Sequence, residues 1–167
     1  MAGAVRIGLV ADTHGVLHPG AEAALAGVDR ILHAGDVGGA AVLDRLARVA
    51  PVWAVRGNVD PPGSLPDERV VEVAGRRILL LHAFPGPRGY ETDPARLAPA
   101  VRARLEADRI DVVVFGHSHR ALVRRDGAVL FVNPGGGGRK RFTLPRSVAT
   151  LDLSGPVPDA AIVYLDR

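Results

Sequence analysis

Five apolar segments of the sequence each lead into polar residues of the types that bind metal ions. In chain order, these residues are Asp12 and His14, Asp36, Asn58, His82, and His117 and His119. Imidazole nitrogens and carboxylate or amide oxygens bind divalent ions such as Zn²⁺, Ni²⁺ and Mn²⁺. Because the sequence contains no cysteine, a metal site in this chain must use ligands of these kinds.

The last of the five segments indicates how two ligands can leave one strand. The apolar run 112–115 is typical of a buried strand, and Gly116 separates it from His117 and His119. Residues two apart on an extended strand point to the same side. If the extended geometry continues past Gly116, the two imidazoles leave the strand end side by side.

Each of these residues, considered alone, also fits an ordinary structural role. An aspartate or asparagine after glycine, as at Asp36 and Asn58, is common in turns. A histidine at the end of an apolar strand, as at His82, is often buried with its hydrogen bonds satisfied. The recurrence favours a site, because strand ends at one edge of a sheet face one cleft. Seven nitrogen and oxygen ligands suit two ions that share a carboxylate.

The elements that must position these residues alternate between strands and helices and then become hairpins. Strands are predicted over 5–10, 30–33 and 52–55, with helices over 20–28 and 39–49 between them. The remaining elements are a hairpin of strands 68–73 and 76–81, a loop 83–93, a helix 94–107, a strand 111–115, a hairpin of strands 121–125 and 128–132, and closing strands 147–153 and 161–165. This order predicts a mixed α and β fold (α+β and α/β) of two packed sheets with helices outside, in one domain spanning 1–167.

Composition favours an ordinary globular protein, with 47% apolar and 23% charged residues. We find no charged leader and no apolar stretch of membrane-spanning length, so we expect a cytoplasmic protein without a membrane partner. The net charge of +3 permits attraction to phosphates. With one Trp, two Tyr and four Phe there is little aromatic material for stacking single strands, which disfavours a nucleic-acid partner. Whether the chain forms a homo-oligomer is left open.

The ordered set Asp-x-His, Gly-Asp, Gly-Asn, a strand-terminal His and Gly-His-x-His resembles the calcineurin-like metallophosphoesterase superfamily. Gly-Asn-x-Asp at 57–60 and Asn-Pro-Gly at 133–135 resemble its small YfcE-type phosphodiesterase branch. The resemblance implies a four-layer α-β-β-α sandwich, a small phosphoester substrate, and two divalent ions. It implies Mn²⁺ as the activating ion, with Zn²⁺, Fe or Ni²⁺ as alternatives.

The resemblance also implies a role for each residue. Asp12, His14 and His119 would bind one ion, Asn58, His82 and His117 would bind the other, and Asp36 would bridge them. A metal-bridging hydroxide would attack phosphorus in line. Asp36, Asn58 and His82 would therefore serve catalysis, and Asn58 and Arg56 would contact a phosphate oxygen.

Two positions depart from the family pattern. Many relatives carry a histidine after Gly-Asn that is proposed to protonate the leaving group, and here that position is Val59. Water, His18 or Asp60 would then supply the proton. Relatives usually read His-Gly-His where this chain has Phe84 as the third residue, so Phe84 is expected to stack in or wall the pocket and favour apolar or aromatic substrates.

A second hypothesis is an interaction module, because a eukaryotic retromer subunit resembles this branch and serves mainly as a scaffold. Scaffold relatives have lost metal-binding histidines, whereas all seven ligand positions are filled here, which favours an enzyme. A nuclease ranks last. Among the other residues, we expect His33 to steady the Asp36 loop, His18 to be exposed, Asn133 to lie in a tight turn, and 139–141 to form a solvated loop with phosphate steering as the alternative.

Overall fold

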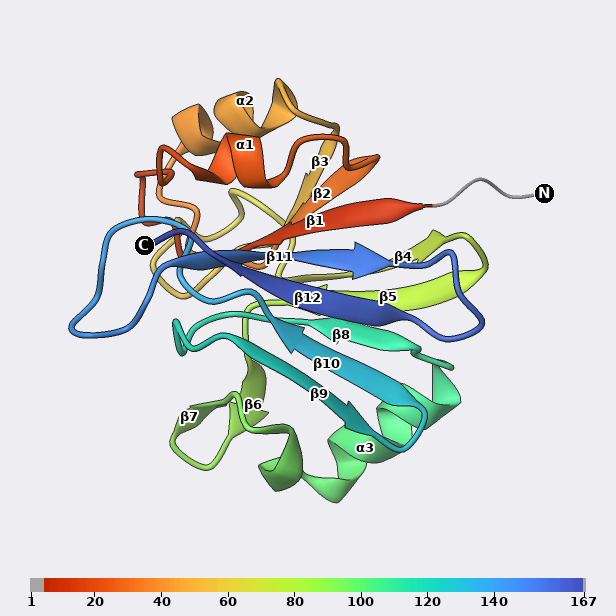
Figure 1. Cartoon of the computed structure of the whole chain (residues 1–167). Coiled ribbons are helices and arrows are strands. Elements are labelled where there is room, and N and C mark those ends of the chain that lie inside the picture. Colours follow the sequence, from red (N-terminus) through yellow and green to blue (C-terminus); the bar gives the residue numbers. More distant parts are fainter. Residues whose placement is uncertain (1–4, 167) are drawn as a thin grey trace.

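Two five-stranded sheets packed face to face form the protein, in a computed structural model that describes residues 5–166 (Figure 1). The first sheet has the order β12 (Asp159–Tyr164), β11 (Ser147–Asp152), β1 (Arg6–Val10), β2 (Arg30–His33), β3 (Val52–Ala54). The second has the order β4 (Glu68–Val73), β5 (Arg76–Leu81), β8 (Val112–Val114), β10 (Val129–Asn133), β9 (Leu122–Asp126). The neighbours β1, β2 and β3 run parallel, as do β5, β8 and β10.

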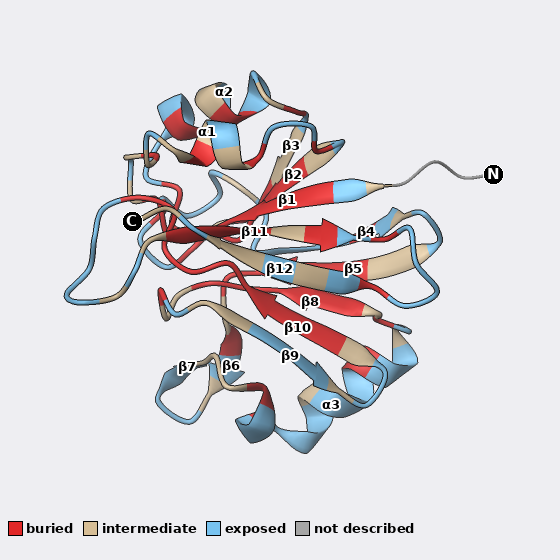
Figure 2. Cartoon of the chain, in the orientation of Figure 1, coloured by how far each residue is buried: buried red, intermediate tan, exposed pale blue. Residues whose placement is uncertain are grey.

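Helices cover the outer face of each sheet. The short α1 (Ala21–Ala24) and α2 (Ala40–Ala47) lie over the first sheet, and α3 (Pro99–Ala107) lies over the second (Figure 1). The strands alternate accordingly: Ile78 and Leu80 of β5 pack between the sheets, whereas Leu79 and Leu81 pack toward α3. Figure 2 shows β8 and β10 as largely buried and the outer surface of α3 as exposed. The layers are therefore α-β-β-α, which confirms the predicted fold class.

The predicted loop 83–93 and helix 94–107 differ from the structure. The segment 83–93 contains a small hairpin of β6 (Phe84–Gly86) and β7 (Gly89–Glu91). A 3₁₀ turn, η1 (Pro94–Arg96), precedes α3, so the helix is not continuous. The reason is Pro99, because a residue before proline is disfavoured in the helical conformation, and Ala98 is extended with φ −58° and ψ 147°.

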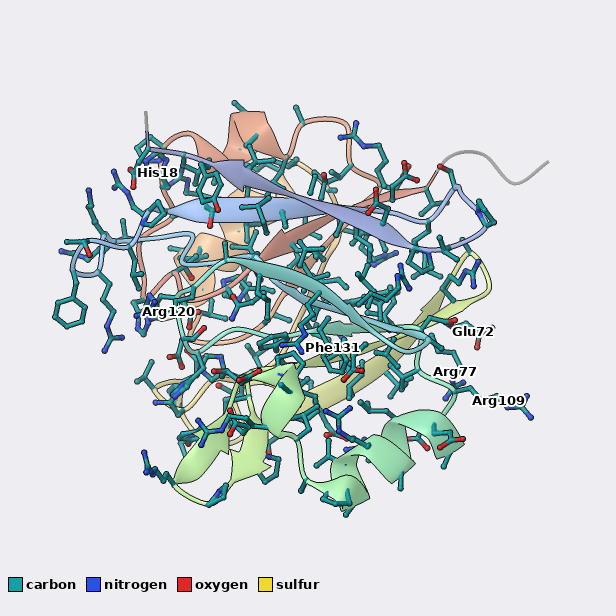
Figure 3. All side chains as sticks on the ribbon, turned by 60° about the horizontal axis from the view of Figure 1, so that its bottom comes forward. His18, Glu72, Arg77, Arg109, Arg120 and Phe131 are labelled. Atoms are coloured by element: carbon teal, nitrogen blue, oxygen red, sulfur yellow. The ribbon has the colours of Figure 1, made fainter. Side chains whose placement is uncertain are left out.

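The loops after the parallel strands of both sheets meet at one end of the molecule. The Gly116 N–H, after β8, donates to the carbonyl of His82, after β5. The Gly137 N–H, after β10, donates to the carbonyl of Ala11, after β1. In Figure 3, Arg120 and His18 lie at this end, whereas Glu72, Arg77 and Arg109 lie at the other and Phe131 lies between. Among the described residues, the helices are all too short or too polar to cross a membrane.

Candidate metal centre

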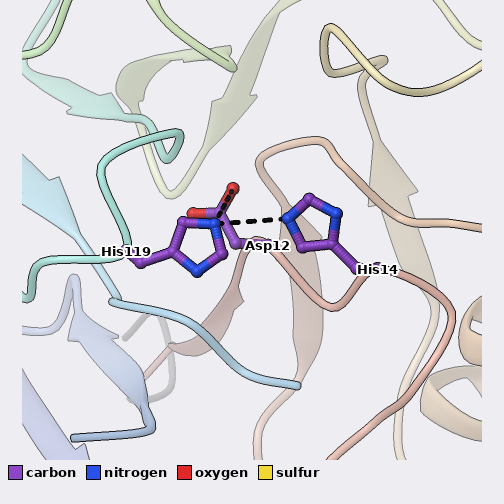
Figure 4. A group of neighbouring side chains, drawn as sticks. All are labelled: Asp12, His14 and His119. Carbon is purple, nitrogen blue, oxygen red and sulfur yellow. Dashed lines mark hydrogen bonds and ion pairs between the residues drawn. The ribbon is translucent and has the colours of Figure 1, made fainter. Parts of the chain in front are cut away.

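The strand-end residues form two adjacent groups. In each group, one nitrogen or carboxylate oxygen from every member lies within 4.8 Å of the others; the groups are Asp12, His14 and His119, and Asp36, His82 and His117. In the first group, Nε2 of His119 lies 3.2 Å from Nε2 of His14 and 3.7 Å from Oδ1 of Asp12 (Figure 4). In the second group, Nε2 of His82 lies 3.3 Å from Nδ1 of His117 and 3.3 Å from Oδ2 of Asp36.

The carboxylate of Asp36 lies between the two groups. Its Oδ2 is 3.6 Å from Nε2 of His14 in the first group and 3.3 Å from Nε2 of His82 in its own. Its Oδ1 accepts a hydrogen bond of 3.0 Å from the Val59 N–H. One oxygen is therefore held by the backbone, while the other faces histidines of both groups.

The exposed Asn58 completes the second group. Its Oδ1 lies 3.0 Å from Nε2 of His82 and 3.0 Å from Nδ1 of His117. An amide oxygen accepts hydrogen bonds and also binds divalent ions. The structure thus brings together all seven residues that the sequence singled out as ligands.

The backbone at these residues is unusual. Eight non-glycine residues of the described chain have positive φ, and five of them belong to the two groups: Asp12, His14, Asp36, His117 and His119. The extended geometry expected after Gly116 is therefore wrong. With φ of 71° and 56°, His117 and His119 turn away from each other into different groups. Such strain persists only where the surroundings enforce it, and it is concentrated at functional sites.

Two glycines allow the loops to approach closely. A Cβ at Gly57 would lie 2.0 Å from Oδ1 of Asp36, and one at Gly35 would lie 2.8 Å from Nδ1 of His82. Gly35 also has φ of 89°, which only glycine adopts readily. The Gly-Asp and Gly-Asn pairs are thus steric requirements for placing Asp36 and Asn58 beside the histidines.

Hydrogen bonds behind the groups fix the orientation of His82 and the loop of His117. The ring Nδ1 of His82 is 2.7 Å from the Ala34 carbonyl, so Nδ1 carries a proton and Nε2 is the nitrogen that faces the group. The buried amide of Asn133 donates to the Gly116 carbonyl at 2.9 Å, and its Oδ1 accepts from the Gly135 N–H. Asn133 therefore supports the loop that carries His117.

The electrostatics of the groups fit a bound cation. Burial raises the pKa of Asp12 to about 7, and Asp12 Oδ2 is buried without a hydrogen-bond partner among the described residues. Burial lowers the pKa of His119 to about 4, with Arg141 and His14 adding to the effect. Burial opposes ionisation of Asp36, but the contacts with His82, the Val59 N–H and His14 together outweigh it, and the pKa of Asp36 is lowered. In the first group, the buried carboxylate of Asp12 beside the imidazole of His119, whose pKa is lowered, calls for a positive charge, which a divalent ion would supply.

Four further residues named from the sequence take other positions. The Arg56 Nε donates to Oδ1 of Asp67 at 2.8 Å, so its guanidinium is engaged by a carboxylate. Asp60 is buried and accepts hydrogen bonds from the N–H groups of Val37, Gly38 and Gly57. It therefore holds these two loops together rather than acting as a proton donor.

The other two, His18 and Phe84, also differ from expectation. The His18 side chain is only 13% exposed; its Nδ1 accepts from the Gly20 N–H and its Nε2 lies 3.9 Å from Asp166. The Phe84 ring is 4% exposed and packs with Leu81 and Leu105 under α3. It therefore packs in the hydrophobic core beneath α3, with residues that belong to neither ligand group.

Two side chains that were not assigned to the site from the sequence contact it. The Arg141 Nη1 lies 3.2 Å from Nε2 of His119. The half-exposed ring of Tyr90 lies on His117, with 4.6 Å between ring centroids. The charged run 139–141 gave a weak signal for Arg141, since phosphate steering was the alternative considered for it. Tyr90 gave no signal, because its position depends on the hairpin in 83–93.

Comparison with known proteins decides the family. The calcineurin-like phosphoesterase superfamily domain matches residues 5–155. The chain belongs to this superfamily. It is 32% identical over 164 residues to a "Probable metallophosphoesterase" of Methanothermobacter thermautotrophicus, covering 94% of this chain and 91% of the relative. It is 31% identical over 158 residues to the "Probable metallophosphoesterase YsnB" of Bacillus subtilis, covering 93% of this chain and 86% of the relative.

Solved structures with the same fold include a phosphodiesterase and Vps29. A structure described as a novel archaeal phosphodiesterase matches with a TM-score of 0.72 and 20% identity, covering 95% of this chain and all of the other. Vps29 of Chaetomium thermophilum matches with a TM-score of 0.75 and 21% identity, covering 96% of each chain. At these identities the likeness shows the fold alone. Family membership together with the two ligand groups supports a metal-dependent phosphoesterase.

Proposed function

We propose that this superfamily member is a dinuclear phosphodiesterase. The observation that supports it most strongly is the position of Asp36, whose Oδ2 faces His14 of one group and His82 of the other. A shared carboxylate between two ligand sets is the arrangement that a pair of ions requires. When bound, the two ions would supply Lewis acidity and lower the pKa of coordinated water.

The residues of the chain would divide between the two ions. Asp12, His14 and His119 would hold the first ion, and His82, His117 and Asn58 would hold the second, with Asp36 between them. The Nδ1 proton of His82, held by Ala34, keeps the Nε2 lone pair free for an ion. His, Asp and Asn ligands fit several divalent ions, and we propose Mn²⁺ as the activating one.

The leaving group would receive its proton from water. Val59 is 56% exposed at the rim and carries no proton, and Asp60 is committed to three backbone N–H groups. Esters with good leaving groups, which need little help from a general acid, would therefore be the better substrates.

The test is hydrolysis of bis-p-nitrophenyl phosphate by metal-stripped protein with Mn²⁺ added back, beside calorimetric counting of bound ions. We expect two ions per chain and metal-dependent turnover. The Asp36→Asn variant should lose at least about a hundredfold in kcat, because both ions lose a charged ligand. Asp44→Asn, which removes the same charge from the exposed face of α2, is the matched control. Robust turnover by Asp36→Asn would contradict the bridging role.

The alternative is an interaction module on the same fold, as the likeness to Vps29 allows. A protein that binds no Mn²⁺ in calorimetry and hydrolyses no ester would support it. In that case the strained ligand loops would have no chemical function.

A further inference from the structure

We propose that Tyr90 and Arg141 hold the two halves of the substrate, which would be a phosphodiester carrying a flat aromatic group on one ester. The proposal rests on the proposed function, because both residues are assigned relative to the two ligand groups. Neither residue is a candidate ligand. They come from separate segments, the β6–β7 hairpin and the loop between β10 and β11, which both lie at the left end of the molecule in Figure 1.

The guanidinium of Arg141 is placed to bind an anion. Its Nη1 lies 3.2 Å from Nε2 of His119, and no carboxylate of residues 5–166 lies within 4.0 Å of its guanidinium. Guanidinium is a donor only, so Nε2 of His119 offers it a lone pair. An ion on that nitrogen would compete for the same lone pair and leave the donors of Arg141 at the rim. The parallel N–H donors of an arginine guanidinium match the two non-bridging oxygens of a phosphodiester.

Arg56 provides the contrast. It was the arginine named from the sequence as a phosphate contact, but Asp67 holds it at 2.8 Å. A paired guanidinium would have to give up this bond to bind a substrate, whereas Arg141 would give up only a neutral imidazole. The structure therefore favours Arg141 as the phosphate contact.

The ring of Tyr90 provides an aromatic face beside the second group. Its centroid lies 4.6 Å from that of His117 at an interplanar angle of 43°, and the residue is 50% exposed. The ring therefore lies tilted against a candidate ligand, while half of the residue remains open to solvent. Aromatic rings in such positions stack on flat groups of ligands.

The hairpin holds Tyr90 in this position. Phe84 pairs with Glu91 across β6 and β7, and its ring is buried under α3. The Glu91 carboxylate accepts from the N–H groups of Thr92 and Asp93, which fixes the exit of the hairpin. The preference for aromatic substrates that the sequence assigned to Phe84 would thus belong to Tyr90, and Phe84 would hold the hairpin in place.

The test compares two esters that share a leaving group, phenyl 4-nitrophenyl phosphate and ethyl 4-nitrophenyl phosphate, with Mn²⁺-loaded protein. In Tyr90→Ala, the ratio of kcat/KM for the phenyl ester to that for the ethyl ester should fall about tenfold, and Tyr90→Phe should restore it. In Arg141→Ala, kcat/KM should fall about tenfold or more for both esters alike, and Arg141→Lys should recover part of it. Arg139→Ala, an exposed neighbour, is the matched control.

Binding supplies a readout independent of turnover. Calorimetry should show that Tyr90→Ala weakens binding of phenyl phosphate about tenfold but not that of ethyl phosphate, with the number of bound Mn²⁺ ions unchanged. An unchanged phenyl preference in Tyr90→Ala, or Arg141→Ala behaving like Arg139→Ala, would overturn the corresponding assignment. If wild-type protein binds Mn²⁺ but hydrolyses neither ester, the proposed function fails, while the phenyl phosphate titration still decides the role of Tyr90.

Discussion

The hydroxyl of Thr13 lies 2.9 Å from Nε2 of His33, and both residues are fully buried behind the ligand loops. The same hydroxyl donates to the Val37 carbonyl, so it accepts from the Nε2–H of His33. The other ring nitrogen of His33 accepts from the Gly35 N–H at 3.2 Å. A neutral imidazole therefore links the loop of Asp12 to the loop of Asp36, the supporting role expected from the sequence.

Replacing His33 should affect stability more than metal content. His33→Ala leaves a cavity and an unpaired Gly35 N–H, which should lower the free energy of unfolding by about 3 kcal/mol. His117→Ala should instead remove the second ion while costing less stability, because His117 is only partly buried. Urea unfolding and ion counting on the two variants separate the roles. Loss of an ion in His33→Ala but not in His117→Ala would mean that the ligand is misassigned.

Acid should destabilise the metal-free protein through His33. Burial lowers its pKa from 6.5 to about 4, so between these values the unfolded chain binds a proton that the folded chain does not. The contribution of His33 to the free energy of unfolding is fully present above pH 6.5. It is lost as the pH falls toward 4, by about 3 kcal/mol in total. Urea unfolding in EDTA should show a steeper loss of stability over this pH range in wild type than in His33→Gln, which retains the contribution of His119. Parallel curves for the two proteins would contradict the shift.

Adding one methyl group at Gly57 should disrupt the centre. The Cβ of Gly57→Ala would lie 2.0 Å from Oδ1 of Asp36 and 2.2 Å from its backbone nitrogen, so Asp36 must move. We expect Mn²⁺ affinity, measured by calorimetry, to fall at least about tenfold. Gly155→Ala, where the nearest atom is 3.4 Å away, is the control and should bind Mn²⁺ as wild type does.

Removing the carboxylate of Asp60 should make the loop that carries Asn58 more mobile. Asp60→Ala leaves the N–H groups of Val37, Gly38 and Gly57 without their acceptor, which should cost about 3 kcal/mol of stability. Hydrogen exchange should then show faster exchange at Gly57 than in Asp44→Asn. Unchanged protection at Gly57 would indicate that the loop is held by other contacts.

Much of this architecture could be predicted from the sequence because its signals are local. Apolar runs and turn residues located the strands of both sheets, and the polar residue after each run located the convergence of the loops. The geometry within the loops could not be predicted, because the left-handed backbone at His117 and His119 is enforced by contacts such as the His117 N–H to Asp12, 105 positions apart. Tyr90 could not be predicted for the same reason, and Arg141 only weakly, because the folded loops determine the positions of both residues.

The left-handed backbone of the ligand loops also lowers the stability of the fold at the positions that carry the candidate ligands. Glycine would relieve strain of about 1–2 kcal/mol at a position such as Asp12 or His117, yet it would remove the side chain that the centre requires. Selection for thermal stability alone would therefore drive these five positions toward glycine or asparagine. A library screened only for folding should accumulate such substitutions there, so these positions mark where the protein has given up stability for function.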